Sequence, residues 1–290
     1  MTRIGRRDFD FDAQVAVMGV INRTPDSFYD RGATFELDRA IEAALTAVSD
    51  GADWVDVGGV PFGRGPVVTV DEEIARVVPV VEGIAAASDV VISVDTNNAE
   101  VAGAAIAAGA AVINDTSGLG DPAMAAVIAE SAAHVVITHS VGPPRVEKPA
   151  AHFDDVVREV TEFLRERVSL ALAAGVPVDR IIVDPGHDLD KNSLHSLELT
   201  RRLDEVVALG HLTLVAVSNK DFIGEVLDRE RTERLEGSLA AMVVCIMKGA
   251  RIVRMHNVAA SVAAVRMTEA ILGFREPAYL LHNTHPTRNV

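Results

Sequence analysis

The chain has 290 residues, a formal net charge of -15 and a single cysteine, Cys245. One cysteine excludes an intramolecular disulfide and suits a reducing compartment. The acidic charge disfavours non-specific binding to nucleic acid, and no run of about twenty apolar residues offers a membrane span. We therefore expect a cytoplasmic protein with neither a nucleic-acid partner nor a membrane partner.

Short apolar runs alternate with segments of helical spacing along the whole chain. Apolar runs of four to eight residues between turn signals are typical of buried strands. Strands are predicted at residues 15–21, 54–57, 90–94, 111–113, 134–138, 180–183, 212–217 and 251–253. Helices are predicted at residues 37–48, from residue 71 onward, and at 98–108, 122–132, 153–174, 193–209, 233–248 and 259–271.

These elements form eight strand–helix pairs with no linker between them. The alternation predicts a parallel sheet, and eight repeats favour a closed (β/α)8 barrel over an open doubly wound sheet. No glycine-rich phosphate-binding pattern follows the first strand, which further weakens the open-sheet alternative. We predict an α/β protein with a single TIM-barrel domain over residues 1–290, whose termini at 1–12 and 277–290 are loose.

Polar side chains stand at the carboxyl ends of the predicted strands. They are Asn22, Asp56, Asp95, Asn114, His139, Asp184, Lys220, Arg254 and His256. Sites in such barrels form at that end from several strands at once. A lone Asp or Asn after a strand is more often a turn residue or a helix cap. Caps do not explain Lys220, Arg254 and His256 at the same rim, so the set as a whole predicts a binding site.

A flat heterocycle with N–H donors and a ring carbonyl suits this mixture of side chains. Asp95 and Asp184 can accept from ring or amino N–H groups, and Lys220 can donate to a carbonyl. The amide of Asn114 can do both.

A phosphate group would fit the end of the last strand. Arg254 and His256 lie two residues apart, hence on one face, and the guanidinium of arginine forms a fork that matches phosphate. Asn22 can supply an oxygen ligand to a Mg²⁺ ion on that phosphate.

Six segments resemble motifs of the dihydropteroate synthase family, in the family's order and across nearly the whole chain. They are Met18-Gly-Val-Ile-Asn-Arg-Thr-Pro-Asp-Ser-Phe28, Ser93-Val-Asp-Thr96, Ile113-Asn-Asp-Thr-Ser-Gly118, Asp184-Pro-Gly186, Ser218-Asn-Lys220 with Phe222-Ile-Gly224, and Arg254-Met-His256. The resemblance implies a pterin-binding barrel of folate biosynthesis, a transferase that joins 6-hydroxymethyl-7,8-dihydropterin pyrophosphate to p-aminobenzoate and releases pyrophosphate. It also implies a homodimer through the last helices.

Roles for individual residues follow from that resemblance. The pterin pocket would comprise Asp95, Asn114, Asp184 and Lys220. The pyrophosphate end would comprise Arg254 and His256, with Asn22 as the Mg²⁺ ligand if this end is retained.

The departures from the family pattern cluster on the side of p-aminobenzoate. The family's Gly-Gly-Glu-Ser-Thr-Arg-Pro-Gly segment reads Gly58-Gly-Val-Pro-Phe-Gly-Arg-Gly65, where Arg64 is the one arginine. Asp-Pro-Gly-Ile-Gly-Phe-Gly-Lys reads Asp184-Pro-Gly-His-Asp-Leu-Asp-Lys191, and Ser-Arg-Lys-Ser reads Ser218-Asn-Lys-Asp221.

Asp221 stands where the family's helix start after the seventh strand receives the benzoate carboxylate, as the free N–H groups of a helix start allow. An inward carboxylate at Asp221 would repel that ligand, whereas an outward one would only cap the helix. We assign Arg64, Ser218 and Asp221 to this altered second-substrate side.

We interpret the chain as a divergent family member that keeps its pterin pocket and has lost most or all of the condensation with p-aminobenzoate. It resembles the second, inactive copies that some actinobacteria carry beside a working synthase. Three alternatives stay open: an active synthase, a corrinoid-dependent methyltransferase of a related barrel family that binds methyltetrahydrofolate, and a non-catalytic binding or scaffold module. The Thr-Pro-Asp-Ser-Phe loop and Arg254-Met-His256 favour the synthase branch over the methyltransferases.

Overall fold

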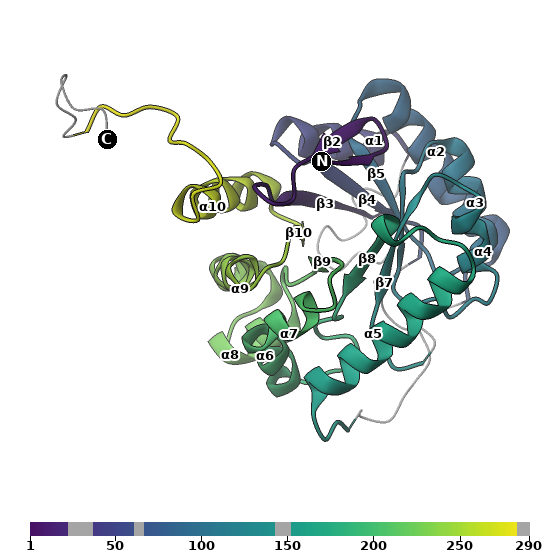
Figure 1. The fold of residues 1–290 in the computed structure, drawn as a ribbon. Coiled ribbons are helices and arrows are strands. Elements are labelled where there is room, and N and C mark those ends of the chain that lie inside the picture. Colours follow the sequence, from purple (N-terminus) through teal and green to yellow (C-terminus); the bar gives the residue numbers. More distant parts are fainter. Residues whose placement is uncertain (23–36, 61–66, 143–151, 283–290) are drawn as a thin grey trace.

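Eight parallel strands close into a barrel in this computed structural model, which describes residues 1–22, 37–60, 67–142 and 152–282 (Figure 1). The strand order around the barrel is β10-β3-β4-β5-β6-β7-β8-β9. The strands are β3 (Ala16–Asn22), β4 (Trp54–Gly58), β5 (Val91–Asp95), β6 (Val112–Asp115), β7 (His134–Thr138), β8 (Ile181–Asp184), β9 (Leu212–Val215) and β10 (Ile252–Met255). The predicted (β/α)8 barrel is therefore confirmed.

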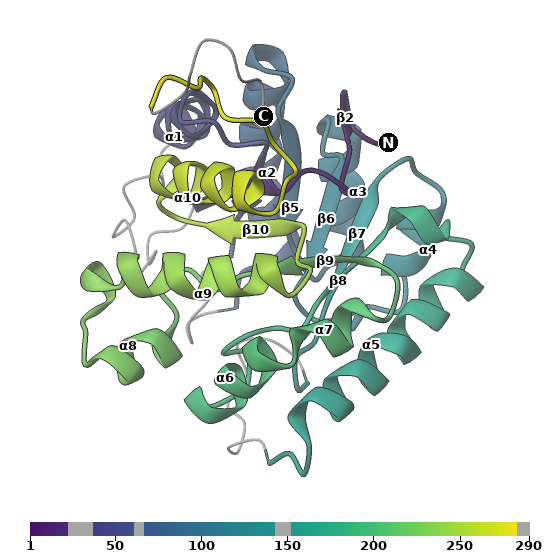
Figure 2. The ribbon, with the colours of Figure 1, turned by 60° about the vertical axis from the view of Figure 1, so that its left-hand side comes forward.

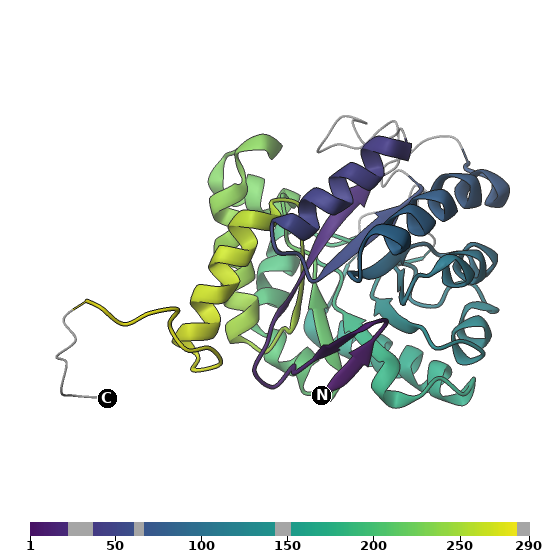
Figure 3. The same ribbon diagram turned by 90° about the horizontal axis from the view of Figure 1, so that it is seen from above.

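Helices surround the strands, as the view from above shows (Figure 3). They are α1 (Leu37–Ser49), α2 (Val70–Ala87), α3 (Ala99–Ala108), α4 (Met124–Ala129), α5 (Val156–Ala173), α6 (Ser193–Arg201), α7 (Leu203–Val207), α8 (Asp221–Leu227), α9 (Leu235–Met247) and α10 (Val258–Ile271), with 3-10 turns at η1 (Val178–Arg180) and η2 (Arg231–Glu233). The single helix predicted at residues 193–209 is two helices, because the backbone leaves the helical conformation at Arg202.

Short polar side chains start several of the helices. Asn98 accepts hydrogen bonds from the backbone of Glu100 and Val101 at the start of α3, and Asp155 does the same at the start of α5. Asn192 begins α6 with a capping box that His195 completes. These side chains satisfy backbone N–H groups that have no partner within the helix.

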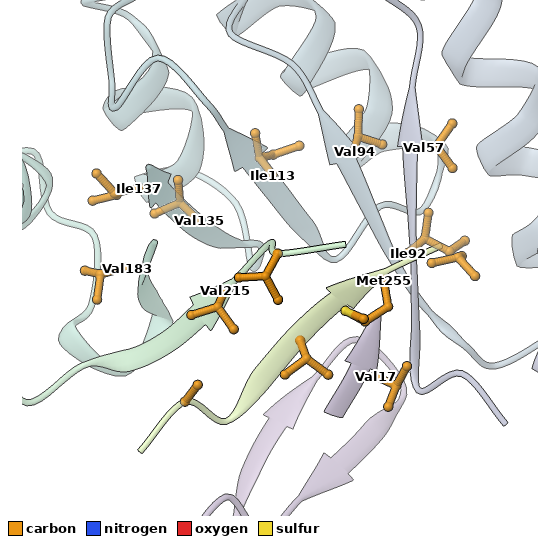
Figure 4. Close-up of a cluster of buried hydrophobic side chains, with 14 of the residues drawn as sticks. Val17, Val57, Ile92, Val94, Ile113, Val135, Ile137, Val183, Val215 and Met255 are labelled. Carbon is orange, nitrogen blue, oxygen red and sulfur yellow. The ribbon is translucent and has the colours of Figure 1, made fainter. Parts of the chain in front are cut away.

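Side chains alternate between the two faces of each strand and so form two apolar layers. The outward layer packs against the helices, and Figure 4 shows part of it, including Val17 of β3, Val94 of β5 and Ile137 of β7. The inward layer lies in the half of the barrel nearer the N-terminal ends of the strands, and it includes Met18 and Trp54. The polar groups described below pack against this apolar layer, nearer the carboxyl ends of the strands.

The N-terminal end of the barrel is closed by a hairpin of β1 (Thr2–Ile4) and β2 (Arg7–Phe9), which lies near the N label in Figures 1 and 3. Ile4 and Phe9 are fully buried, and the ring of Phe9 lies 6.0 Å from that of Trp54. The expectation of a loose terminus at residues 1–12 is therefore wrong. A three-residue strand has too few apolar residues to produce a periodic pattern in the sequence. The apolar residues of these two strands, Ile4 and Phe9, are nevertheless completely buried.

At the other terminus, residues 277–282 are exposed and form no helix or strand. They extend away from the body in Figure 1, on the side that is turned toward the viewer in Figure 2. The remaining part of the expected loose segment, residues 283–290, lies outside the described residues. Across the described ranges, no helix is both long and apolar enough to cross a membrane.

Candidate functional site

Inside the barrel, a layer of polar side chains lies next to the apolar layer, on the side of the carboxyl ends of the strands. Residues two apart on a strand share a face, and on five of the strands an inward apolar side chain is followed, two residues nearer the carboxyl end, by an inward polar one. The pairs are Trp54 and Asp56, Val91 and Ser93, Val112 and Asn114, Ile182 and Asp184, and Ile252 and Arg254. The alternation of the strands thus gathers these polar groups at one end of the barrel.

Asp56 is the centre of this layer and is fully buried. Its Oδ1 accepts a hydrogen bond from Ser93 Oγ at 2.6 Å, and its Oδ2 accepts from Asn114 Nδ2 at 3.0 Å and from Arg254 Nε at 2.6 Å. A buried carboxylate is tolerated only with such pairing. We call Asp56, Ser93, Asp95, Asn114 and Arg254 the floor cluster.

Asp95 lies at the edge of the floor cluster, with 30% of its side chain exposed. Its Oδ2 is 3.5 Å from an Nη of Arg254. Burial and the nearby Asp56 charge raise the pKa of Asp95 to about 7, against the lowering effect of Arg254. The negative charge of Asp56 therefore favours a proton on Asp95.

Asn114 leaves one hydrogen-bonding atom open. Its Nδ2 donates to Asp56, but its buried Oδ1 has no partner among the described residues. A buried acceptor without a donor is costly unless a ligand or water supplies one. The floor cluster therefore presents an acceptor to a guest that carries N–H groups.

Asp184 and Lys220 belong to the same electrostatic neighbourhood. Burial raises the pKa of Asp184 to about 6, while the Gly186 N–H and the charges of Lys220, Lys191 and Arg254 act in the opposite direction. Burial lowers the pKa of Lys220, and Asp188 and Asp184 partly offset that effect. The four residues predicted to bind pterin thus lie at one end of the barrel, with Asp95 and Asn114 also adjacent in register.

His256 and Ser218 form a pair beside Arg254. Ser218 Oγ accepts the backbone N–H of His256 at 3.2 Å and lies 3.0 Å from its Nδ1. Burial, with the charges of Arg254 and Lys220, lowers the pKa of His256 to about 3, so the ring is neutral at physiological pH. Ser218 therefore contacts a residue of the predicted pyrophosphate end, and its assignment to the second-substrate side stays a prediction.

A buried lysine, Lys191, holds the β8–α6 loop, residues 185–192, through hydrogen bonds to its backbone carbonyl oxygens. Lys191 Nζ donates to Gly186 O at 2.9 Å and Leu189 O at 3.0 Å, and it lies 2.8 Å from His139 Nδ1. Gly186 has a φ of +69°, and a Cβ there would lie 2.1 Å from the carbonyl oxygen of His139. Only glycine fits this turn, which joins the loops after β7 and β8.

Two aspartates in the β8–α6 loop occupy left-handed backbone positions, Asp188 with φ +63° and Asp190 with φ +55°. Both stand where the family pattern has glycine. Asp190 Oδ2 accepts the backbone N–H of Val141 at 2.7 Å, on one side of the loop. On the other side, Asp188 Oδ2 accepts the backbone N–H groups of Asp221 and Phe222, the latter at 3.2 Å. A carboxylate of the chain itself therefore covers the first amides of α8.

Asp221 points away from those amides. Its Oδ1 lies 2.8 Å from an Nη of Arg234, which also donates to the carbonyl oxygens of Asn219 and Lys220. Its side chain is 62% exposed. The inward orientation considered for Asp221 is thus wrong: the outward orientation is observed, and Asp188 supplies the negative charge at the helix start.

Two predicted site residues cannot be placed. Arg64 lies outside the described residues, and only the backbone of Asn22 is described, as the last residue of β3. Within the described ranges, no group of three or more His, Cys, Asp or Glu side chains could hold a metal ion. The Mg²⁺ prediction therefore stays a prediction that depends on Asn22.

The sequence matches the model of a family described as "Pterin binding enzyme" over residues 18–256. The chain belongs to the pterin binding enzyme family. Among its relatives in this family, "Inactive dihydropteroate synthase 2" of Mycobacterium leprae is 48% identical over 271 residues, 90% of this chain and 92% of the relative. The dihydropteroate synthase of Escherichia coli is 39% identical over 261 residues, 90% of this chain and 93% of that protein.

Solved structures of family members share the barrel. The structure described as Yersinia pestis dihydropteroate synthase with a sulfonamide drug complex has a TM-score of 0.87 and 34% identity, covering 92% of this chain and 97% of that one. The resemblance read from the six motifs is thereby confirmed, as is the likeness to inactive second copies.

Three residues that shape the site received no individual role from the sequence. Asp56 stands among the polar strand ends but carries no family motif, and Ser93 appears only as the first residue of one. Asp188 appears only as a departure from glycine. A signal for Asp188 does exist, because an acidic residue at a left-handed position needs a local hydrogen-bond partner. The sequence does not say which backbone amides supply it.

Proposed function

We propose that this chain binds a pterin above the floor cluster and does not condense it efficiently with p-aminobenzoate. Family membership and the polar layer support the first half of this proposal. The observation that carries the second half is the carboxylate of Asp188 on the first amides of α8. The family resemblance assigns that helix start to the carboxylate of p-aminobenzoate.

The pterin ring finds complementary groups on several strands. Asn114 Oδ1 is an open acceptor for a ring N–H, and the carboxyls of Asp95 and Asp184 can accept from the amino group and ring nitrogens. Lys220 can donate to the ring carbonyl. Because the pKa values of Asp95 and Asp184 are raised to about 7 and about 6, a ligand that donates hydrogen bonds would draw both carboxyls into the ionised form.

The pyrophosphate end is weaker in charge than the residue types alone imply. Arg254 is engaged with Asp56 and Asp95, and His256 is neutral, so it offers a hydrogen bond rather than a positive charge. We propose that a pterin pyrophosphate binds here with Mg²⁺, to which Asn22 would contribute its side-chain oxygen. Mg²⁺ would add positive charge to that of Arg254, which is already paired with Asp56 and Asp95.

The relatives support a loss of condensation. The Mycobacterium leprae protein named inactive shares 48% identity with this chain, and the Escherichia coli enzyme shares 39%. We further propose a homodimer in the cytoplasm, as the family resemblance implies.

Two measurements on the wild-type protein test this proposal. Calorimetric titration with 6-hydroxymethyl-7,8-dihydropterin pyrophosphate, with and without Mg²⁺, should show saturable binding that Mg²⁺ strengthens. Release of pyrophosphate in the presence of p-aminobenzoate should be at least about a hundredfold slower than with the Escherichia coli synthase, a difference of about 2.7 kcal/mol in activation free energy. A rate within tenfold of that enzyme would show an active synthase instead. Absence of pterin binding would contradict the first half and favour a scaffold module.

A further inference from the structure

We infer that Asp188 is a specificity-determining residue. It selects, as the ligand beside the pterin, an amine that carries no carboxylate. The inference rests on the proposed function and concerns only this second ligand. It assigns to the chain's own carboxylate the place that a carboxylate on the ligand would otherwise take.

Both oxygens of the Asp188 carboxylate are engaged within the protein. Oδ2 accepts the backbone N–H groups of Asp221 and Phe222, and Oδ1 accepts the hydroxyl of Ser196 at 3.0 Å. The backbone N–H of Asp188 donates to the same hydroxyl at 3.1 Å. The side chain is thus held at both ends, and three separate segments of the chain meet at it.

The backbone of the β8–α6 loop keeps this carboxylate in position. Asp188 has a φ of +63°, a conformation in which most residues are strained and in which aspartate persists when its side chain finds local donors. Lys191 anchors the loop from beneath through the carbonyl oxygens of Gly186 and Leu189. The contact with α8 is therefore part of a fixed turn.

An external carboxylate would gain little at this helix start. The N–H groups of Asp221 and Phe222 are already bonded, and their partial positive charge is balanced by Asp188. A second anion would also meet the Asp188 charge directly. Arg234, a cation that contacts this helix start, is held by Asp221 and by two backbone carbonyls. A neutral amine avoids all of these conflicts.

The test compares p-aminobenzoate with aniline, which differ only in the carboxylate. Dissociation constants are measured by ligand-observed NMR on the full chain, first alone and then with 6-hydroxymethylpterin and pyrophosphate present. For the wild type we expect the two ligands to bind equally, within about threefold. Asp188→Gly restores the residue of the family pattern, suits the positive φ, and should favour p-aminobenzoate by about tenfold or more, which is 1.4 kcal/mol.

Asp190→Gly is the matched control. It makes the same change in the same loop at another positive φ, but its carboxylate bonds to Val141 on the opposite side. The ratio of the two affinities should stay at the wild-type value. If Asp188→Gly does not fold, Asp188→Asn removes the charge, keeps an oxygen for the α8 amides, and should favour p-aminobenzoate by about threefold.

A tenfold preference of the wild type for p-aminobenzoate overturns the inference, as does an equal gain in Asp188→Gly and Asp190→Gly. An unchanged ratio in both Asp188→Gly and Asp188→Asn also overturns it. Failure of the proposed function looks different: pterin then does not bind, while the ratio for the two amines is still measured on the unloaded protein.

Discussion

The floor cluster and the β8–α6 loop lie at the same end of the barrel, yet they are built in different ways. The floor cluster stands on strands, where the pleat fixes the direction of each side chain and the barrel wall excludes water. In the β8–α6 loop, Asp188 and Asp190 have left-handed backbone conformations. Their carboxylates accept hydrogen bonds from backbone N–H groups of neighbouring segments. One region is fixed by the sheet and the other by its own side chains.

The two regions also differ in what they leave open to a ligand. The floor cluster retains a buried acceptor on Asn114 and a carboxyl on Asp95 whose pKa is raised to about 7. In the β8–α6 loop, the carboxylate of Asp188 meets donors of the chain on both oxygens. A protein can therefore lose one ligand of a two-substrate site while its barrel stays intact, because loop side chains can change without altering strand register.

The largest effect should come from replacing Arg254 by Met, which breaks the floor cluster at its only described cation. Asp56 would remain fully buried without its charge partner, and Asp95 would lose the same guanidinium. Removing one partner of a buried ion pair costs about 3–5 kcal/mol. We expect urea unfolding to show that loss and calorimetry to show no pterin binding.

Arg3→Met is the matched control, because Arg3 pairs with Asp8 on the exposed surface of the hairpin. Its unfolding free energy should change by at most about 1 kcal/mol. Equal losses in the two variants would mean that the floor cluster is no more dependent on its charges than the surface is.

A smaller effect should appear in the pH dependence of stability through Asp95. Its pKa is raised from 3.8 to about 7, mainly by burial, so the folded state binds this proton more tightly than the unfolded state. The stabilisation is fully present below pH 3.8 and is lost as the pH rises through 7. Since 30% of the side chain is exposed, we expect a loss of about 1–2 kcal/mol.

Asp95→Asn isolates this contribution, because every other titrating group is common to both proteins. Urea unfolding at pH 5 and pH 8 should show a smaller decline for the variant than for the wild type. If the unfolding free energy of the wild type declines no more steeply than that of Asp95→Asn, the Asp95 carboxyl is already ionised at pH 5. Water would then reach the floor cluster more than its burial implies.

The contrast between the two regions also explains what the sequence can predict. Strand ends such as Asp95, Asn114 and Asp184 are read directly, because period-two alternation dictates both their face and their height in the barrel. The hairpin at residues 1–12 is missed, because Ile4 and Phe9 show their role only once the barrel exists to receive them.

Loop contacts are beyond the reach of pattern alone. Asp188 and Asp221 look equally able to oppose a ligand's carboxylate, and Asp221 is the closer in sequence to the helix start. The outcome depends on Arg234, thirteen residues further along, which draws the Asp221 carboxylate outward. The same applies to Ser218, whose partner His256 is 38 residues away in the chain. Long-range hydrogen bonds of this kind carry no local sequence signal.

Ser218→Ala should sharpen the boundary between the two regions. The hydroxyl bonds to the backbone N–H and Nδ1 of His256, so its loss should destabilise the fold by about 1 kcal/mol. We expect the affinity for inorganic pyrophosphate to fall while the ratio of p-aminobenzoate to aniline binding stays constant. A change in the amine ratio instead would support the assignment of Ser218 to the second-substrate side.

The smallest effect should come from Asp221→Ser, which restores the family residue at the start of α8. Because the Asp221 carboxylate is 62% exposed and faces Arg234, its loss should change the unfolding free energy by less than about 1 kcal/mol. Arg234 keeps its bonds to the carbonyl oxygens of Asn219 and Lys220, so the turn should hold its shape. In the NMR titration the variant should bind p-aminobenzoate and aniline in the wild-type ratio. If Asp221→Ser instead favoured p-aminobenzoate as strongly as Asp188→Gly, the charge that excludes a carboxylate would be the exposed one, and the difference between the two aspartates would not hold.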